Sequence, residues 1–78
     1  MLKLEKKLVV TFFTSTEAMA TEKACKEANI YGTLISAPRN ITSDCGISFA
    51  TGIEYRYDIE NLLKDKNIEF DRIVETFV

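Results

Sequence analysis

The chain has 78 residues, of which 46% are hydrophobic and 28% are charged, a composition typical of one small globular domain spanning residues 1–78. A net charge of −2 provides no basic field for phosphate backbones, so nucleic acid is excluded as the main partner. With no histidine and two cysteines, the chain has too few ligands for a common zinc site and lacks the usual general base of a hydrolase.

The beginning of the chain superficially resembles the basic start of a signal peptide. The apolar run behind it, residues 8–13, is too short for a signal core or a membrane span. We therefore expect a cytoplasmic protein with no membrane partner. In that compartment its two cysteines are expected as reduced thiols.

Residues 7–13 predict the first strand, because they are β-branched, aromatic and apolar on both faces. Thr14 and Glu17 form a capping-box pattern, which predicts a helix from there to about Asn29. Small residues form the predicted inner face of this helix. They are Ala18, Thr21, Cys25 and Ala28, flanked by Ala20 and Ala24. Cys25 is therefore expected to lie in the core.

Two short strands follow, over residues 33–36 and 47–51, on either side of a polar loop over residues 37–46. A second amphipathic helix lies within residues 55–66, where Asp58 is either an internal residue or the N-cap. Residues 71–77 predict the last strand.

This element order, βαββαβ, predicts an α+β fold: a ferredoxin-like sandwich with one antiparallel sheet and both helices on one face. Right-handed crossovers place the first and third strands in the centre. The second sheet face then has no cover, so we expect Val9, Phe13 and Ala50 to be partly exposed there. Such exposure indicates either a homodimer or partner contact through this face, or scattered apolar residues on the surface.

The polar loop contains the residues with chemical potential. Cys45 follows turn-forming residues that include Ser43, and Gly46 after it permits a close approach or a positive φ. Arg39 supplies a permanent positive charge with forked donors. With free backbone N–H groups, these residues are candidates to stabilise a thiolate or an anionic adduct on Cys45. Asp44 opposes this, because a neighbouring carboxylate disfavours a second negative charge.

Two structural alternatives remain for Cys45. It is either a small residue tucked beneath a turn, or it forms a disulfide with Cys25 if the loop folds back onto the first helix. Arg39 has an alternative of its own, as a solvated charge paired with Asp44.

The loop sequence Pro38-Arg39-x-Ile41-Thr42-Ser43-x-Cys45-Gly46, followed by an apolar strand, resembles the signature of a family of small bacterial selenium/sulfur carrier-like proteins. The resemblance extends over most of the chain. It includes the strand-to-helix entry at residues 12–18, the second strand and turn at 34–39, and the approach to the last strand at 68–70.

The resemblance implies that Cys45 carries sulfur or selenium, with Arg39, Ser43 and Gly46 as supporting loop residues. Its thiolate would accept the atom from a donor protein and pass it to an acceptor protein by thiol–disulfide-type exchange, without a cofactor. One alternative is a binding or regulatory module that uses the same loop without covalent chemistry. Another is a structural subunit of a larger assembly.

Overall fold

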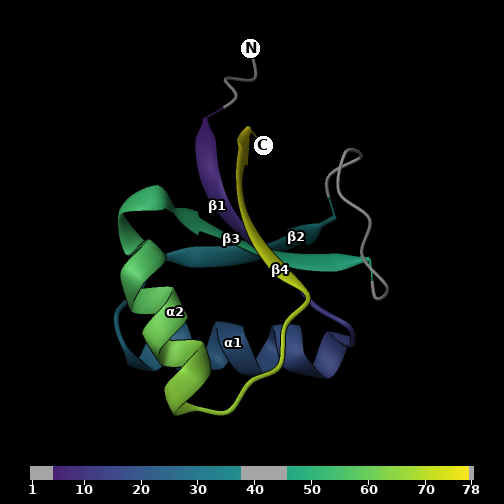
Figure 1. Ribbon diagram of the computed structural model, residues 1–78, viewed down its shortest axis with the longest axis vertical. Coiled ribbons are helices and arrows are strands. Elements are labelled where there is room, and N and C mark those ends of the chain that lie inside the picture. The colour runs from purple at the N-terminus through teal and green to yellow at the C-terminus, as the bar shows by residue number, and fades with distance from the viewer. Residues whose placement is uncertain (1–4, 38–45, 78) are drawn as a thin grey trace.

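The computed structural model describes residues 5–37 and 46–77. The described elements are β1 (Lys6–Thr11), α1 (Ser15–Glu27), β2 (Gly32–Ser36), β3 (Ile47–Gly52), the short 3₁₀ helix η1 (Ile53–Tyr55), α2 (Arg56–Asp65) and β4 (Arg72–Phe77). The predicted βαββαβ order is confirmed. Figure 1 shows the strands twisted across one another in a single sheet, with α1 and α2 lying at an angle to each other.

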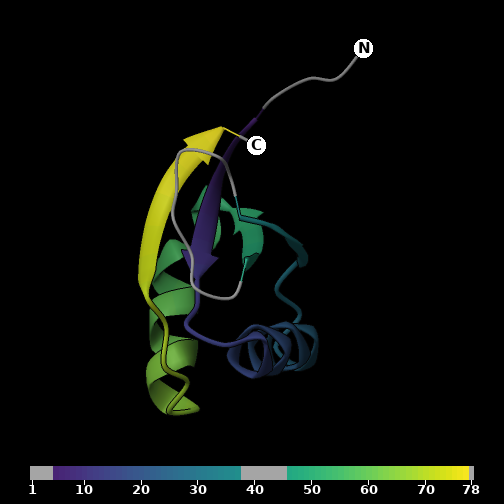
Figure 2. The same cartoon turned by 90° about the vertical axis from the view of Figure 1, so that its right-hand side faces the viewer.

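The sheet has the order β2-β3-β1-β4, and every neighbouring pair is antiparallel. The first and third strands are therefore central, as the ferredoxin-like prediction requires. Side chains of both helices pack against Leu8, Val10 and Phe12 in the β1 region. Both helices therefore lie on the same face of the sheet. Figure 2 shows the same layers after a quarter turn, with α1 seen nearly end-on. The chain is thus an α+β, ferredoxin-like sandwich.

Local side chains fix the start of α1, and an asparagine follows the end of each helix. The Thr14 hydroxyl accepts a hydrogen bond from the Glu17 N–H at 3.4 Å, and a Glu17 carboxylate oxygen accepts one from the Thr14 N–H at 3.2 Å. The predicted capping box is confirmed. Asn29 and Asn67 adopt φ values of 61° and 55° just beyond α1 and α2, a left-handed conformation that asparagine tolerates better than most residues. Asp58 lies inside the first turn of α2, so it is not the N-cap.

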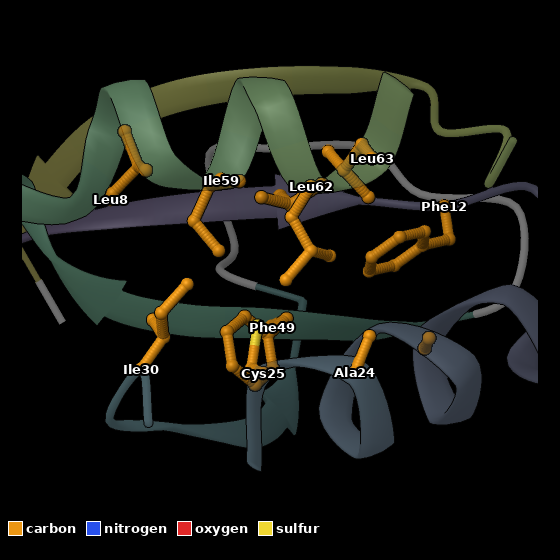
Figure 3. Packing of buried hydrophobic residues seen from close by; sticks show 11 residues of the cluster. Leu8, Phe12, Ala24, Cys25, Ile30, Phe49, Ile59, Leu62 and Leu63 are labelled. Carbon is orange, nitrogen blue, oxygen red and sulfur yellow. The ribbon is translucent and has the colours of Figure 1, made fainter. Parts of the chain in front are cut away.

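The core lies between the helices and the sheet (Figure 3). Its largest fully buried side chains include Phe12, Phe49 and Leu8. On α1 the buried residues are Ala18, Thr21, Ala24 and Cys25. Ala28 is exposed, so its predicted place on the inner face is wrong. The reason is that α1 ends at Glu27 and Ala28 is only its C-cap.

The sheet face opposite the helices is less open than predicted. Phe13 is 46% exposed, but Val9 is 0% and Ala50 is 6% exposed, so the expectation was wrong for these two residues. Val9 lies between Ala50 of β3 and Val74 of β4 in the register, so both of its flanks are covered. Val9 and Ala50 therefore give no support to a dimer through this face, whereas Phe13 is exposed as expected.

Candidate functional site

Of the predicted site residues, the structure describes only Gly46. Arg39, Ser43 and Cys45 lie outside the described residues, as does Asp44. The site is therefore built from the chain on either side of this segment and from the strand ends around it.

Gly46 and Ala37 form the base of the thiol loop, which we define as residues 38–45. The Ala37 N–H donates a hydrogen bond to the Gly46 carbonyl at 3.0 Å and extends the β2–β3 ladder one pair beyond Ser36 and Ile47. Gly46 has a φ of 73°, which is the second of the two roles expected for it, a close approach or a positive φ. A Cβ at Gly46 would meet no atom within 4 Å. The backbone conformation, and not lack of space, is therefore what requires glycine here.

A polar row crosses the sheet at the same end. In the register Thr11 lies opposite Ser48 of β3 and Arg72 of β4, and adjacent partners in an antiparallel sheet share a face. The Thr11 hydroxyl donates to an Asp71 carboxylate oxygen at 3.3 Å, and the Arg72 Nε lies 3.6 Å from the same oxygen. We call Thr11, Ser48, Asp71 and Arg72 the strand-end row.

Ser48 is the least satisfied member of this row. Its side chain is fully buried, and its Oγ has no hydrogen-bond partner among the residues that the structure describes. An unsatisfied buried hydroxyl costs about 1–3 kcal/mol. Thr11 is also fully buried, whereas the Arg72 side chain is 55% exposed and keeps its guanidinium in solvent. The row thus contains two buried hydroxyl groups, on Thr11 and Ser48, and one exposed cation, Arg72.

Sequence reasoning missed this row. The sequence motif predicted a positive charge near the thiol from Arg39, within the loop. Arg72 is 27 residues beyond Cys45 in the sequence and belongs to no such motif. The strand alternation places Thr11 and Ser48 on one face, but pairing both with Arg72 requires the strand order and register, which only the assembled sheet supplies.

The second cysteine, Cys25, lies in the core and has a weakly acidic thiol. Cys25 is 1% exposed, in the same cluster as Phe49 and Leu63, and its thiol is free. Burial raises the pKa of the Cys25 thiol from 9.0 to about 11. The expectation that Cys25 is a core residue is confirmed. Because its thiol is free, a disulfide with Cys25 is not formed.

Within residues 5–37 and 46–77, no group of three or more acidic, cysteine or histidine side chains is placed to hold a metal ion. Among the helices of that same part of the chain, none has both the length and the apolar character needed to cross a membrane.

The comparisons with known proteins agree with the loop signature. The family model described as "Putative Se/S carrier protein-like" matches residues 7–75, a range that includes the thiol loop and every strand and helix core described above. No curated protein and no solved structure gives a significant match. Because the family match covers most of the chain, this protein belongs to the Se/S carrier protein-like family.

Proposed function

We propose that this protein carries sulfur or selenium on Cys45, as a persulfide or a selenosulfide, from a donor protein to an acceptor protein. The family match supports the carrier role. The burial of Cys25 is the observation that directs the chemistry to Cys45. The chain has two cysteines, and a thiol that is 1% exposed with a pKa of about 11 is a poor nucleophile at neutral pH.

The proposed transfer is a thiol exchange. The Cys45 thiolate attacks the terminal sulfur of a donor persulfide, R–S–SH. A new S–S bond forms, the donor S–S bond breaks, and the donor leaves as the thiolate R–S⁻. The products are Cys45–S–SH and R–S⁻, so electrons balance without an external oxidant or a cofactor. An acceptor thiolate then attacks the terminal atom in the same way, and selenium follows the same scheme.

Charge at the strand ends supports this proposal. A persulfide is anionic near neutral pH, so it gains from nearby donors. Within the proposal Arg39 and Ser43 supply donors from the loop, and Gly46 supplies the turn that follows Cys45. Arg72 adds an exposed guanidinium at the end of the sheet where Gly46 lies. Asp71 tempers this charge, because it lies 3.6 Å from the Arg72 Nε. The proposal places the protein in the cytoplasm, where thiols stay reduced.

Intact-mass analysis tests the proposal. Purified protein is treated with inorganic polysulfide, and we expect one added sulfur atom that dithiothreitol removes. The adduct should disappear in Cys45→Ser and persist in Cys25→Ser. If Cys25→Ser loses the adduct while Cys45→Ser keeps it, the carrier assignment is wrong. If no variant gains sulfur, a non-covalent binding module becomes the better account.

A thiol-reagent assay provides the matched control. In Cys45→Ser the remaining thiol is Cys25, whose raised pKa alone lowers the thiolate fraction near neutral pH by about 100-fold. We expect this variant to react with an aromatic disulfide reagent only on the timescale of unfolding, and Cys25→Ser to react at once. Equal rates would show that Cys45 has no advantage over the buried thiol.

A further inference from the structure

The two edges of the sheet differ in their protection. β4 contains Arg72 and Glu75, and Glu75 forms ion pairs with Lys6 at 3.8 Å and with Arg56 at 2.7 Å. β2, with the sequence Gly-Thr-Leu-Ile-Ser, has neither a charged residue nor a proline. Natural edge strands are usually blunted by charges, proline or bulges, because unpaired backbone groups attract other strands. The residues of β2 themselves therefore provide neither a charge nor a proline against strand pairing.

The free backbone groups of β2 are identified by the ladder. The Ala37 N–H bonds to the Gly46 carbonyl, and hydrogen-bonded pairs alternate along an antiparallel ladder without a bulge. Gly32, Leu34 and Ser36 therefore direct their N–H and C=O groups away from β3. Within the described part of the chain, the contact made by these outward groups is a 3.5 Å hydrogen bond from the Thr33 hydroxyl to the Leu34 carbonyl.

Hollows flank β2 on both faces. On the face opposite the helices, a groove of about 470 Å³ is lined by alternate residues Tyr31, Thr33 and Ile35, with Ala50 beside them. On the side of α1, a hollow of about 240 Å³ is lined by Ile30 and Gly32 among others. An added strand points successive side chains to opposite faces, so it would place side chains in the groove beside Thr33 and Ile35 and one in the hollow beside Gly32.

We propose that an extended segment of the protein that donates or accepts the cargo pairs with β2 as an additional strand. The size of the edge favours this occupant over a permanent second copy. A five-residue strand buries far less than the ~1,200–2,000 Å² of a stable interface, and a carrier must release its partners.

The position of β2 in the fold also favours a segment of the donor or acceptor protein. β2 leads into Ala37, whose bond to Gly46 closes the base of the thiol loop, so a docked segment lies beside that base. The segment carries an uncharged, apolar side chain for the groove at Ile35 and Ala50. The identity of this partner, but not the pairing itself, rests on the proposed carrier function.

The decisive variant is Ser36→Pro, with Ser36→Ala as its matched control. Proline removes the outward N–H of Ser36 without removing a bond to β3, a position where edge strands tolerate it, whereas alanine keeps the N–H. Thr33→Lys adds a charge to the exposed groove and is the second variant. Circular dichroism and thermal unfolding show whether each variant retains the parent fold.

The probe is a phage-displayed library of linear octapeptides, selected on the full-length protein. We expect the selected peptides to protect the Gly32, Leu34 and Ser36 amides from hydrogen exchange, and to bind Ser36→Pro and Thr33→Lys about tenfold more weakly or worse. Ser36→Ala and Cys45→Ser should bind as the parent does. The proposal is overturned if no peptide binds, if binding ignores Ser36→Pro, or if sedimentation shows that β2 pairs with a second copy instead.

Polysulfide loading of Cys45 separates the two proposals. If the edge proposal alone fails, the parent and Ser36→Pro still gain one sulfur atom while peptide binding is absent or insensitive. If the carrier function alone fails, no sulfur is gained but peptide binding still depends on Ser36.

Discussion

The packed region around Cys25 and the strand ends around Gly46 place opposite demands on their residues. Cys25 is enclosed with Phe49 and Leu63 in the cluster beneath the helices, where shape and apolarity decide which side chain fits. At Gly46 a Cβ would meet nothing, and the constraints there are a positive φ and a backbone hydrogen bond from Ala37. The difference teaches that Cys25 is constrained by side-chain packing in the core, whereas Gly46, which follows Cys45 in the sequence, is constrained by its backbone conformation.

Two glycines show the same contrast. A Cβ at Gly32 would clash with the Phe49 ring, so the first glycine is required by packing. Gly46 is required by conformation. Substitutions in the packed region should therefore lower stability strongly and leave thiol chemistry unchanged, whereas those at the strand ends should do the reverse.

The largest effect on stability is expected for Phe49→Ala. Phe49 is fully buried against both helices, so its truncation should lower the free energy of unfolding by about 3–5 kcal/mol. Urea unfolding measures the loss, with Phe49→Leu as the milder control. A loss below about 1 kcal/mol would show that the packed region is not the main source of stability.

Next in size is Gly32→Ala, which should lower the free energy of unfolding by about 1–3 kcal/mol because the added Cβ clashes with the Phe49 ring and the Ala50 carbonyl. The double variant Gly32→Ala with Phe49→Leu should recover part of this cost, because a smaller side chain relieves the clash. Additive losses in a double-mutant cycle would show that the Phe49 ring is not the source of the cost.

A pH effect should follow from Cys25. Its folded-state pKa of about 11 lies above the ordinary 9.0, so the unfolded chain loses its proton first as pH rises. The contribution to stability is complete below pH 9 and is lost progressively toward pH 11, by about 2 kcal/mol. Unfolding of Cys45→Ser between pH 8 and pH 11 measures it, and Cys25→Ala in the same background should lack this component.

The smallest effect on stability is expected for Gly46→Ala. A positive φ costs a non-glycine residue about 1 kcal/mol, with no steric clash to add to it. Because Gly46 follows the proposed carrier residue, sulfur loading from polysulfide should slow even where stability barely changes. Gly46→Asn is the control, since asparagine tolerates this conformation. Normal loading in Gly46→Ala would show that the turn has no part in the chemistry.

Local patterns predicted most of the scaffold. The capping box at Thr14 and Glu17 and the burial of Cys25 follow from short-range rules, and the structure confirms both. The errors occurred where a pattern was continued too far or considered without its neighbours. Ala28 was assigned to a helix face that ends one residue earlier, and Val9 was judged without the strands that flank it.

The candidate site was predicted less completely. The loop motif made Cys45 a candidate and gave Gly46 two possible roles, of which the structure shows the positive φ. Arg72 and Ser48 could not be found in the same way, because they are connected through Thr11 only by the register of three strands. No local rule relates residues 11, 48 and 72 before the sheet has formed.

The sequence by itself determined the order of elements, the helix start at Thr14 and the family to which the chain belongs, because periodicity, capping and motif spacing are written in neighbouring residues. Tertiary structure alone decided which strands form the edges, which hydroxyl is buried without a partner among the described residues, and which guanidinium lies at the same end of the sheet as Gly46. Each of these depends on long-range strand pairing, which joins residues that are distant along the chain.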